Sequence, residues 1–361
     1  MSSSGRPGNN FDFLRFALAS LVVLSHSFPL ATGTEHDEPL ARVTNGQLTF
    51  GALAVDGFFV ISGFLVLQSW RRDPRTVPFL RKRILRIYPG FLVAAVLGAF
   101  VIAPAYRSLP HPPLDADFVG RFLFDAVRLQ ADIPWPSFDA NPAPGTVNGS
   151  LWSIPYEAWC YVLVWVAGLL MLDGRRVLVA GTFALFVVVG FVFEWRHLTP
   201  GGRMLGQIFG YPPLWARLLP FFLAGMTFLA WQDRIRLTAG GAALAFLALA
   251  IAARVPHGMP LAMPTAGAYL LFWFALRPIP RLSGFAARGD FSYGIYLFSF
   301  PILQMIVHHV GTPLHPLALF AIGWPLALVA AALSWHLVEK HCIRLSHARA
   351  PARAAVVGHS A

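Results

Sequence analysis

The stretch RFALASLVVLSHS, residues 15–27, is an apolar run with two ionisable side chains, Arg15 and His26. Their separation of eleven positions is close to three turns of an α-helix, so both would lie on one face, roughly 16 Å apart. An ionisable residue inside a membrane-spanning helix is by default a functional candidate. The alternatives are that Arg15 only snorkels to the membrane surface and that His26 bonds a backbone carbonyl in the core.

Composition indicates a membrane protein. Of the 361 residues, 56% are hydrophobic and 12% charged, about half the charged fraction of soluble domains. Apolar runs long enough to cross a bilayer recur along the chain, and only helices close their own backbone hydrogen bonds there. We therefore expect an all-α, polytopic helical bundle with about ten transmembrane helices, near residues 11–31, 51–70, 84–105, 150–171, 177–194, 214–231, 237–254, 260–276, 291–310 and 316–337.

The distribution of basic residues predicts the orientation of the chain in the membrane. The formal charge is +11, but the basic side chains lie in short stretches between apolar runs, which argues against a nucleic-acid partner. If the N-terminus is inside, nineteen of the 28 Lys and Arg residues lie on inner stretches and eight on outer ones. The positive-inside rule then predicts that both termini are cytoplasmic. We expect one transmembrane domain over residues 1–340, with its first helix retained, and a basic cytoplasmic tail, 341–361, without regular structure.

The longest connection, about 106–149, would lie outside the cell. Within it FVGRFLFDAVRL, residues 118–129, places apolar side chains near one helical face, which predicts an interfacial helix or lid; a packed loop is the alternative. Cys160 lies in an apolar run and Cys342 beyond the last one, so we expect neither a disulfide nor a metal site.

A dense basic segment, RRDPRTVPFLRKRILRIYP (71–89), follows the second span. It contains the candidate anion-binding residues Arg71, Arg72, Arg83 and Arg86, and the last two are one helical turn apart. A cationic pocket at the inner surface suits a polyanion such as a nucleotide phosphate group. The alternatives are a topology signal and binding to anionic lipid headgroups.

Acidic residues and His26 are expected at the outer side. Asp56 begins the second span and Glu157 the fourth, at depths near that of His26. An imidazole can act as general base or accept an acyl group near neutral pH, and a carboxylate could orient it, so His26, Asp56 and Glu157 are the catalytic candidates. Glu157 could instead be a structural partner of an Arg or Tyr.

Aromatic residues supply the candidate substrate contacts. Tyr293 and Tyr296 in FSYGIYLFSFPILQ (291–304) could line a polar path, together with Gln304. Trp152 belongs to an aromatic group at the start of the fourth span. Hydroxyls bonded within the bundle and an aromatic belt at the membrane surface are the alternatives.

These motifs together resemble the acyltransferase 3 family of integral membrane enzymes that O-acylate sugars and other acceptors. The matching segments are RFALASLVVLSH, VDGFFVISGFLV, RKRILRIYP and NGSLWSIPYEAWCY, with SYGIYLFSFPILQ similar to the late-helix motif. Many members carry a His where this chain has Ser299, so a role for that His does not transfer. Other members carry a fused extracytoplasmic hydrolase-like domain, which we do not expect here.

The resemblance implies a function. The donor would be acetyl-CoA bound from the cytoplasm, and the acceptor a hydroxyl of an extracytoplasmic, possibly lipid-linked glycan such as O-antigen, capsule or exopolysaccharide. His26 would be the base or acyl relay, Arg15, Arg83 and Arg86 cofactor-phosphate or structural cations, and Glu157 an active-site carboxylate. The location would be a bacterial inner membrane. The alternatives are a transporter or exporter, and an acyltransferase that uses succinyl or a longer acyl group.

Overall fold

The computed structural model describes residues 9–107, 116–130, 137–200, 206 and 208–347. Throughout these residues the regular elements are helices, and the described β-pairing is a single bridge between Arg107 and Ser137. In the described part of the chain, seven helices are long and apolar enough to cross a membrane. They begin and end at Phe11–Thr32, Phe50–Arg72, Thr76–Ala105, Arg176–Trp195, Pro212–Trp231, Ser292–Val310 and Pro316–Ser346.

Named by element, the first half of the chain contains α1 (Phe11–Thr32), α2 (Pro39–Val43), α3 (Phe50–Arg72), α4 (Thr76–Leu97), η1 (Gly98–Ile102), α5 (Ala103–Ala105), α6 (Ala116–Val127), η2 (Leu151–Ser153) and α7 (Ile154–Leu169). The second half contains α8 (Arg176–Trp195), α10 (Pro212–Trp231), α11 (Ala239–Ala252), α12 (Met259–Ala262), η3 (Met263–Gly267), α13 (Ala268–Ala275), η4 (Phe285–Arg288), α14 (Ser292–Val310), α15 (Pro316–Ser334), η5 (Trp335–Glu339) and α16 (Lys340–His347).

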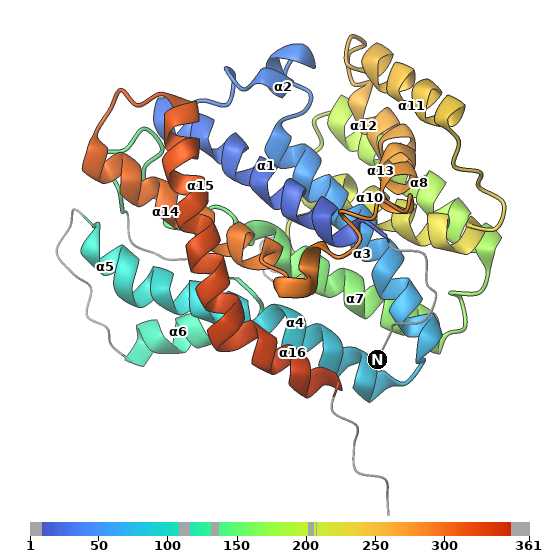
Figure 1. Ribbon diagram of the computed structural model, residues 1–361, viewed down its shortest axis with the longest axis horizontal. Coiled ribbons are helices and arrows are strands. Elements are labelled where there is room, and N and C mark those ends of the chain that lie inside the picture. Colours follow the sequence, from blue (N-terminus) through green and yellow to red (C-terminus); the bar gives the residue numbers. More distant parts are fainter. Residues whose placement is uncertain (1–8, 108–115, 131–136, 201–205, 207, 348–361) are drawn as a thin grey trace, which may run out of the picture.

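The prediction of a membrane helical bundle is confirmed. Each of the ten expected spans coincides with a helix, but three of these helices are shorter than the seven long ones: α7, α11 and the continuous run Met259–Ala275. The tail predicted for 341–361 begins as helix, because α16 extends to His347, and its remainder lies outside the described residues. Figure 1 shows α11 to α13 on one side of the bundle and α4 to α6 on the opposite side.

The centre of the bundle is α3, which packs closely on α10. An added Cβ at Gly63 would lie 1.9 Å from the carbonyl oxygen of Phe222, and one at Gly225 would lie 2.1 Å from that of Val60. Small residues let helix backbones approach in membranes, where packing rather than the hydrophobic effect drives association. The SGF segment of the second-span motif therefore has a packing role.

The long connection is fixed to α14. Fully buried Gln304 donates to the carbonyl oxygens of Ala143 and Thr146, at 2.8 and 3.0 Å, and accepts from the Asn141 side chain at 2.8 Å. Gln304 thus anchors a loop instead of lining a polar path. Residues 116–127 form helix α6, as expected from the amphipathic pattern, and Phe118 and Phe122 pack edge-on against Phe100.

Candidate active site

A central cavity of about 110 Å³ lies between five helices, α1, α3, α4, α7 and α14. Such a volume has room for several waters or a slender ligand. Its lining includes most of the predicted site residues, which come from four distant segments of sequence: Arg15, Arg83, Arg86, Glu157, Tyr293 and Tyr296. The sequence grouped Glu157 with His26 and Asp56 at the outer side, apart from the arginines, whereas the structure brings Glu157 and the three arginines to one cavity.

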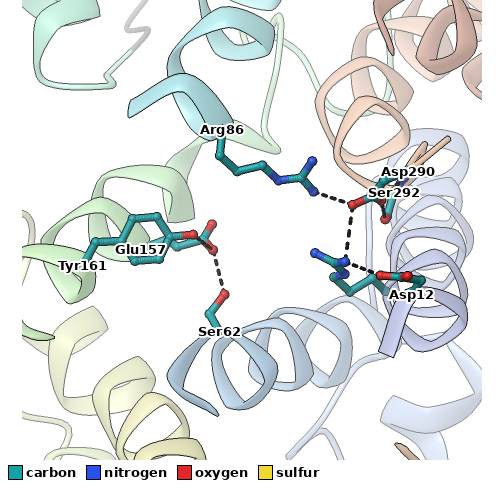
Figure 2. A network of polar contacts seen from close by, with 8 residues as sticks. Asp12, Ser62, Arg86, Glu157, Tyr161, Asp290 and Ser292 are labelled. Atoms are coloured by element: carbon teal, nitrogen blue, oxygen red, sulfur yellow. Dashed lines mark hydrogen bonds and ion pairs between the residues drawn. The ribbon is translucent and has the colours of Figure 1, made fainter. Parts of the chain in front are cut away.

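One side of this cavity is lined by Arg15, Arg86 and Ser292, which bond Asp12 or Asp290, and these five residues are called the Asp290 wall (Figure 2). Arg86 Nη2 donates to Asp290 Oδ2 at 2.7 Å, and Arg15 Nη2 lies 3.5 Å from the same oxygen while it also bonds Asp12. Burial alone would raise the pKa of Asp290, but the Arg86 and Arg15 guanidinium groups hold it below its usual range. This carboxylate joins α1, α4 and the start of α14.

The opposite side, the Glu157 wall, consists of Ser62, Arg83, Glu157 and Tyr161. Ser62 Oγ and the Tyr161 hydroxyl donate to Glu157 Oε1 at 2.7 and 2.6 Å (Figure 2). Arg83 lies over the Tyr161 ring at 5.5 Å and donates to Ser69 Oγ at 3.2 Å. Among the described residues no carboxylate pairs with Arg83, and its buried Nε has no hydrogen-bond partner.

Arg83 also lines a second cavity, the Arg72 cavity, with Arg72, Asp73 and Lys82. Its volume is about 290 Å³. Arg75 hydrogen-bonds the Asp73 carboxylate and thereby lowers the pKa of Asp73. Three cations against one carboxylate leave this cavity with a net positive charge. Arg71 does not line it, because its guanidinium contacts Asp173 at 3.6 Å.

His26 lines a third cavity, the His26 cavity, of about 210 Å³. It shares this lining with Glu35, Trp152, Arg217 and Tyr296. The imidazole packs edge-on against Phe300, with ring centroids 5.1 Å apart, and its buried Nδ1 has no partner among the described residues. Among the described residues, His26 Nδ1 therefore does not bond a backbone carbonyl, which was the alternative reading of this histidine.

Asp56 and Glu157 lie apart from His26. The nearly buried Asp56 carboxylate pairs with Arg217 Nη2 at 3.1 Å and lines a separate space, the Asp56 cavity. Glu157 faces the central cavity. Among the described residues, neither predicted carboxylate contacts the imidazole. Arg217, which bonds Asp56, lines both the Asp56 cavity and the His26 cavity.

The Arg72, central and His26 cavities follow one another along α3. Leu65 and Arg83 line both the Arg72 and the central cavity, and Val55 and Tyr296 line both the central and the His26 cavity. The α3 residues that line these three cavities run from Gly51 to Arg72, a rise of about 32 Å, close to the hydrocarbon thickness of a bilayer. Tyr296 at the second junction bonds Ser153 Oγ at 2.7 Å.

The remaining predicted substrate contacts have partners. The Tyr293 hydroxyl donates to the carbonyl oxygen of Ile87 at 2.8 Å, and its ring lies 5.7 Å from the Arg86 guanidinium. Trp152 lies 5.8 Å beneath Arg217. Tyr293 lines the central cavity and Trp152 the His26 cavity, and the Tyr293 hydroxyl is bonded within the bundle, as its alternative reading held.

Sequence reasoning missed Asp290, Ser62, Tyr161 and Arg217. Arg217 carried a usable signal, because it lies inside the expected span 214–231 and was counted only as an outer charge. Asp290 directly precedes the expected ninth span. Ser62 and Tyr161 gave no signal, since hydroxyls are common in membrane helices.

Comparison with known proteins identifies the chemistry. Residues 9–336 match the family model described as an acyltransferase domain. An O-acetyl transferase of Shigella phage Sf6 is 27% identical over 94% of this chain and 97% of its own length. Nodulation protein 10 of Rhizobium leguminosarum bv. viciae is 27% identical over 93% and 94%. The exopolysaccharide production protein ExoZ of Rhizobium meliloti (strain 1021) is 28% identical over 42% and 44%. No solved structure matches.

Proposed function

Because this chain belongs to the acyltransferase 3 family, and is a multi-pass membrane O-acyltransferase, we propose that it transfers an acetyl group from cytoplasmic acetyl-CoA to a hydroxyl of an extracytoplasmic glycan. The observation that carries this proposal is the row of three cavities along α3. Cations gather at one end of the row and His26 lies at the other. A donor that is anionic at one end and reactive at the other matches that order of groups.

The cationic end fits a polyphosphate. Arg72, Lys82 and Arg83 line the Arg72 cavity, where Arg83 has no carboxylate partner among the described residues. Its Nε, and that of Arg15 in the central cavity, are buried donors without a partner there. An unpaired buried guanidinium donor costs free energy unless a ligand accepts its hydrogen bond. When bound, acetyl-CoA would supply the activated acyl thioester.

His26 has the free nitrogen that the chemistry needs. In the proposed reaction the imidazole takes the proton of the acceptor hydroxyl, and the acceptor oxygen forms a bond to the acyl carbon. The carbon–sulfur bond of the thioester breaks, and the proton passes on to the departing thiolate. A brief acyl-imidazole intermediate is the other route open to the same residue.

The proposed acceptor follows from the relatives. One is named for O-acetyl transfer and another for exopolysaccharide production, which supports a surface polysaccharide as the acceptor.

The basic residues, nineteen of 28 on one side, support cytoplasmic termini in a bacterial inner membrane. Lipid-linked glycan and a longer acyl group such as succinyl remain variants of the same reaction.

The test is His26→Ala in a strain that lacks the chromosomal copy, followed by mass analysis of its surface polysaccharides. We expect the acetyl mass increment to disappear while the protein stays in the membrane, since loss of a general base costs on the order of 10²–10⁴ in rate. His341→Ala is the matched control, because that exposed residue on α16 lines none of the cavities.

Two results would contradict the proposal. Full acetylation by His26→Ala would remove the mechanism. An unmodified polysaccharide in both the wild-type and deletion strains, with the glycan retained inside the deletion strain, would favour an exporter. Thermal stabilisation of the purified protein by coenzyme A, and not by an unrelated nucleotide, would tie the Arg72 cavity to the donor.

A further inference from the structure

Arg217 is the one guanidinium group among the described residues that line the His26 cavity. It lies near the start of α10, where its side chain is 36% exposed. Two contacts define its position: Asp56 Oδ1 at 3.1 Å from Nη2, and the Trp152 ring at 5.8 Å from Cζ. No motif quoted for the family resemblance includes this residue.

The hydroxyl groups that line the His26 cavity are already engaged, and its exposed carboxylate, Glu35, offers acceptors and no donor. Ser25 Oγ donates to the buried carboxylate of Glu38, and Thr49 Oγ1 caps α3 by accepting from the Ala52 amide. The Tyr296 hydroxyl bonds Ser153. Arg217, in contrast, has five N–H donors, of which the described contacts use only a part.

Acyl transfer requires more than a base. When the acceptor oxygen attacks the thioester carbonyl, negative charge develops on the carbonyl oxygen. Preorganised donors aimed at that oxygen are usually the largest single contribution to catalysis of such reactions. His26 cannot supply this stabilisation while it removes the acceptor proton, so a second group in the same cavity is needed.

We propose that Arg217 is a catalytic residue that donates hydrogen bonds to the developing oxyanion, and that Asp56 is the positioning residue that holds its guanidinium in place. This inference rests on the proposed acyl transfer. The Asp56 carboxylate is 4% exposed and fixed on α3, the helix that lines all three cavities, so it restrains one edge of the guanidinium. The remaining donors stay available towards the cavity that contains His26.

The central experiment removes the pair without leaving a buried charge alone. Asp56→Asn/Arg217→Gln replaces both charges by amides, which avoids the unpaired carboxylate that Arg217→Gln would leave. We expect kcat for acyl transfer to fall about 10²–10³-fold, the range for loss of an oxyanion donor, with the KM for the acceptor changed less than about threefold. Asp56→Asn alone, in which Arg217 keeps its charge, should lose about 5–20-fold in kcat, less than the double variant.

The matched control is the exposed ion pair between Arg176 and Asp233, 2.8 Å apart, which lines none of the cavities. Asp233→Asn/Arg176→Gln should keep wild-type kcat and KM. Retained thermal stabilisation by coenzyme A shows that each variant is folded. Arg217→Lys keeps the positive charge and should recover part of the lost kcat. If the double variant does not fold, Arg217→Lys replaces it as the test.

Two outcomes would overturn the inference. The first is a wild-type kcat in the double variant. If the double variant does not fold, the equivalent result is a wild-type kcat in both Asp56→Asn and Arg217→Lys. The second is a raised acceptor KM at unchanged kcat, which would make Arg217 an acceptor-binding residue. If either result is found and His26→Ala is inactive, the role of Arg217 is rejected and the proposed function is retained. Activity in His26→Ala would remove the proposed function first.

Discussion

The two walls of the central cavity carry similar groups but hold them differently. On the Asp290 wall, Arg15 and Arg86 share one carboxylate, and Asp12 also bonds Arg15. On the Glu157 wall, Arg83 has no carboxylate partner among the described residues, and Glu157 accepts hydrogen bonds from neutral hydroxyls. Charges that neutralise each other hold helices together, whereas charges left without a counterion are available to a ligand.

Arg83 and Arg86 illustrate the difference most directly. They are one turn apart on α4 and line the same cavity, but Arg86 lies 2.7 Å from a carboxylate oxygen and Arg83 reaches only Ser69 and two aromatic rings. From the sequence alone, both arginines were equivalent candidates for binding an anion. In the structure Arg86 is paired within the fold, and Arg83 has no carboxylate partner among the described residues, so we expect Arg83 to be the one that contacts the donor.

Asp290→Ala should have the largest effect on stability, because it breaks the contact on which the Asp290 wall depends. Two partly buried guanidinium groups would lose their shared carboxylate, and removal of one partner of a buried ion pair costs about 3–5 kcal/mol. We expect the free energy of unfolding to fall by about 3 kcal/mol, because the pair is 12% and 23% exposed. Denaturant titration of the purified protein measures this loss. Asp233→Ala, which breaks an exposed pair, is the control and should lose less than about 1 kcal/mol.

The same carboxylate gives the Asp290 wall a pH dependence. Because the pKa of Asp290 is held below its usual range by Arg86 and Arg15, its contribution to stability is fully present above the unfolded value of about 3.9. It is lost as pH falls below about 3.9, since the unfolded chain then binds a proton first. Asp290→Asn should flatten the stability profile below that pH, and an unchanged profile would show that the wall is not held by this charge.

Arg83→Gln tests the Glu157 wall and should affect function more than stability. If Arg83 contacts donor phosphate, loss of one charge-assisted contact worth about 1.5–3 kcal/mol raises the KM for acetyl-CoA roughly 10–100-fold. The melting temperature should change little, because no described ion pair is broken. Initial rates at varied donor concentration measure the effect. Arg175→Gln, at an exposed position outside the cavities, is the control.

The opposite result for Arg83→Gln would contradict a difference in role between Arg83 and Arg86. A large drop in melting temperature with an unchanged KM would make Arg83 as structural as Arg86. The donor would then have to bind elsewhere, with Arg72 and Lys82 as the remaining cations of the Arg72 cavity.

The sequence predicted much of this arrangement and failed on particular contacts. Hydrophobicity placed each of the ten expected spans on a helix, seven of them long enough to cross a membrane among the described residues, since long apolar runs have few alternatives in a bilayer. The sequence singled out Arg15, Arg83, Arg86 and Glu157, all of which line the central cavity, but depth along the chain groups Glu157 with His26 and not with the arginines. Which charges pair could not be predicted, because Asp290 lies more than 200 positions from Arg86 and partner choice depends on how distant helices pack. The sequence also grouped His26 with Asp56 because they are expected at similar depth. Residues at equal depth can face different cavities, and in the structure Asp56 bonds Arg217 and lines a cavity separate from that of His26.

Ser62→Ala should have the smallest effect of these substitutions, and it tests how much one hydroxyl contributes to the Glu157 wall. It removes one of the two hydroxyls that bond Glu157 Oε1 and leaves the Tyr161 hydroxyl at 2.6 Å. Loss of one such hydrogen bond to a charged group costs at most about 1.5–3 kcal/mol, and less here because a second donor and the cavity remain. We expect a loss of about 1 kcal/mol in stability and a several-fold lower kcat, measured by titration and initial rates, with Thr182→Ala on α8 as the hydroxyl-removal control. If Ser62→Ala instead lost as much stability as Asp290→Ala at unchanged kcat, Glu157 would be a structural carboxylate like Asp290, and both walls would serve the fold alone.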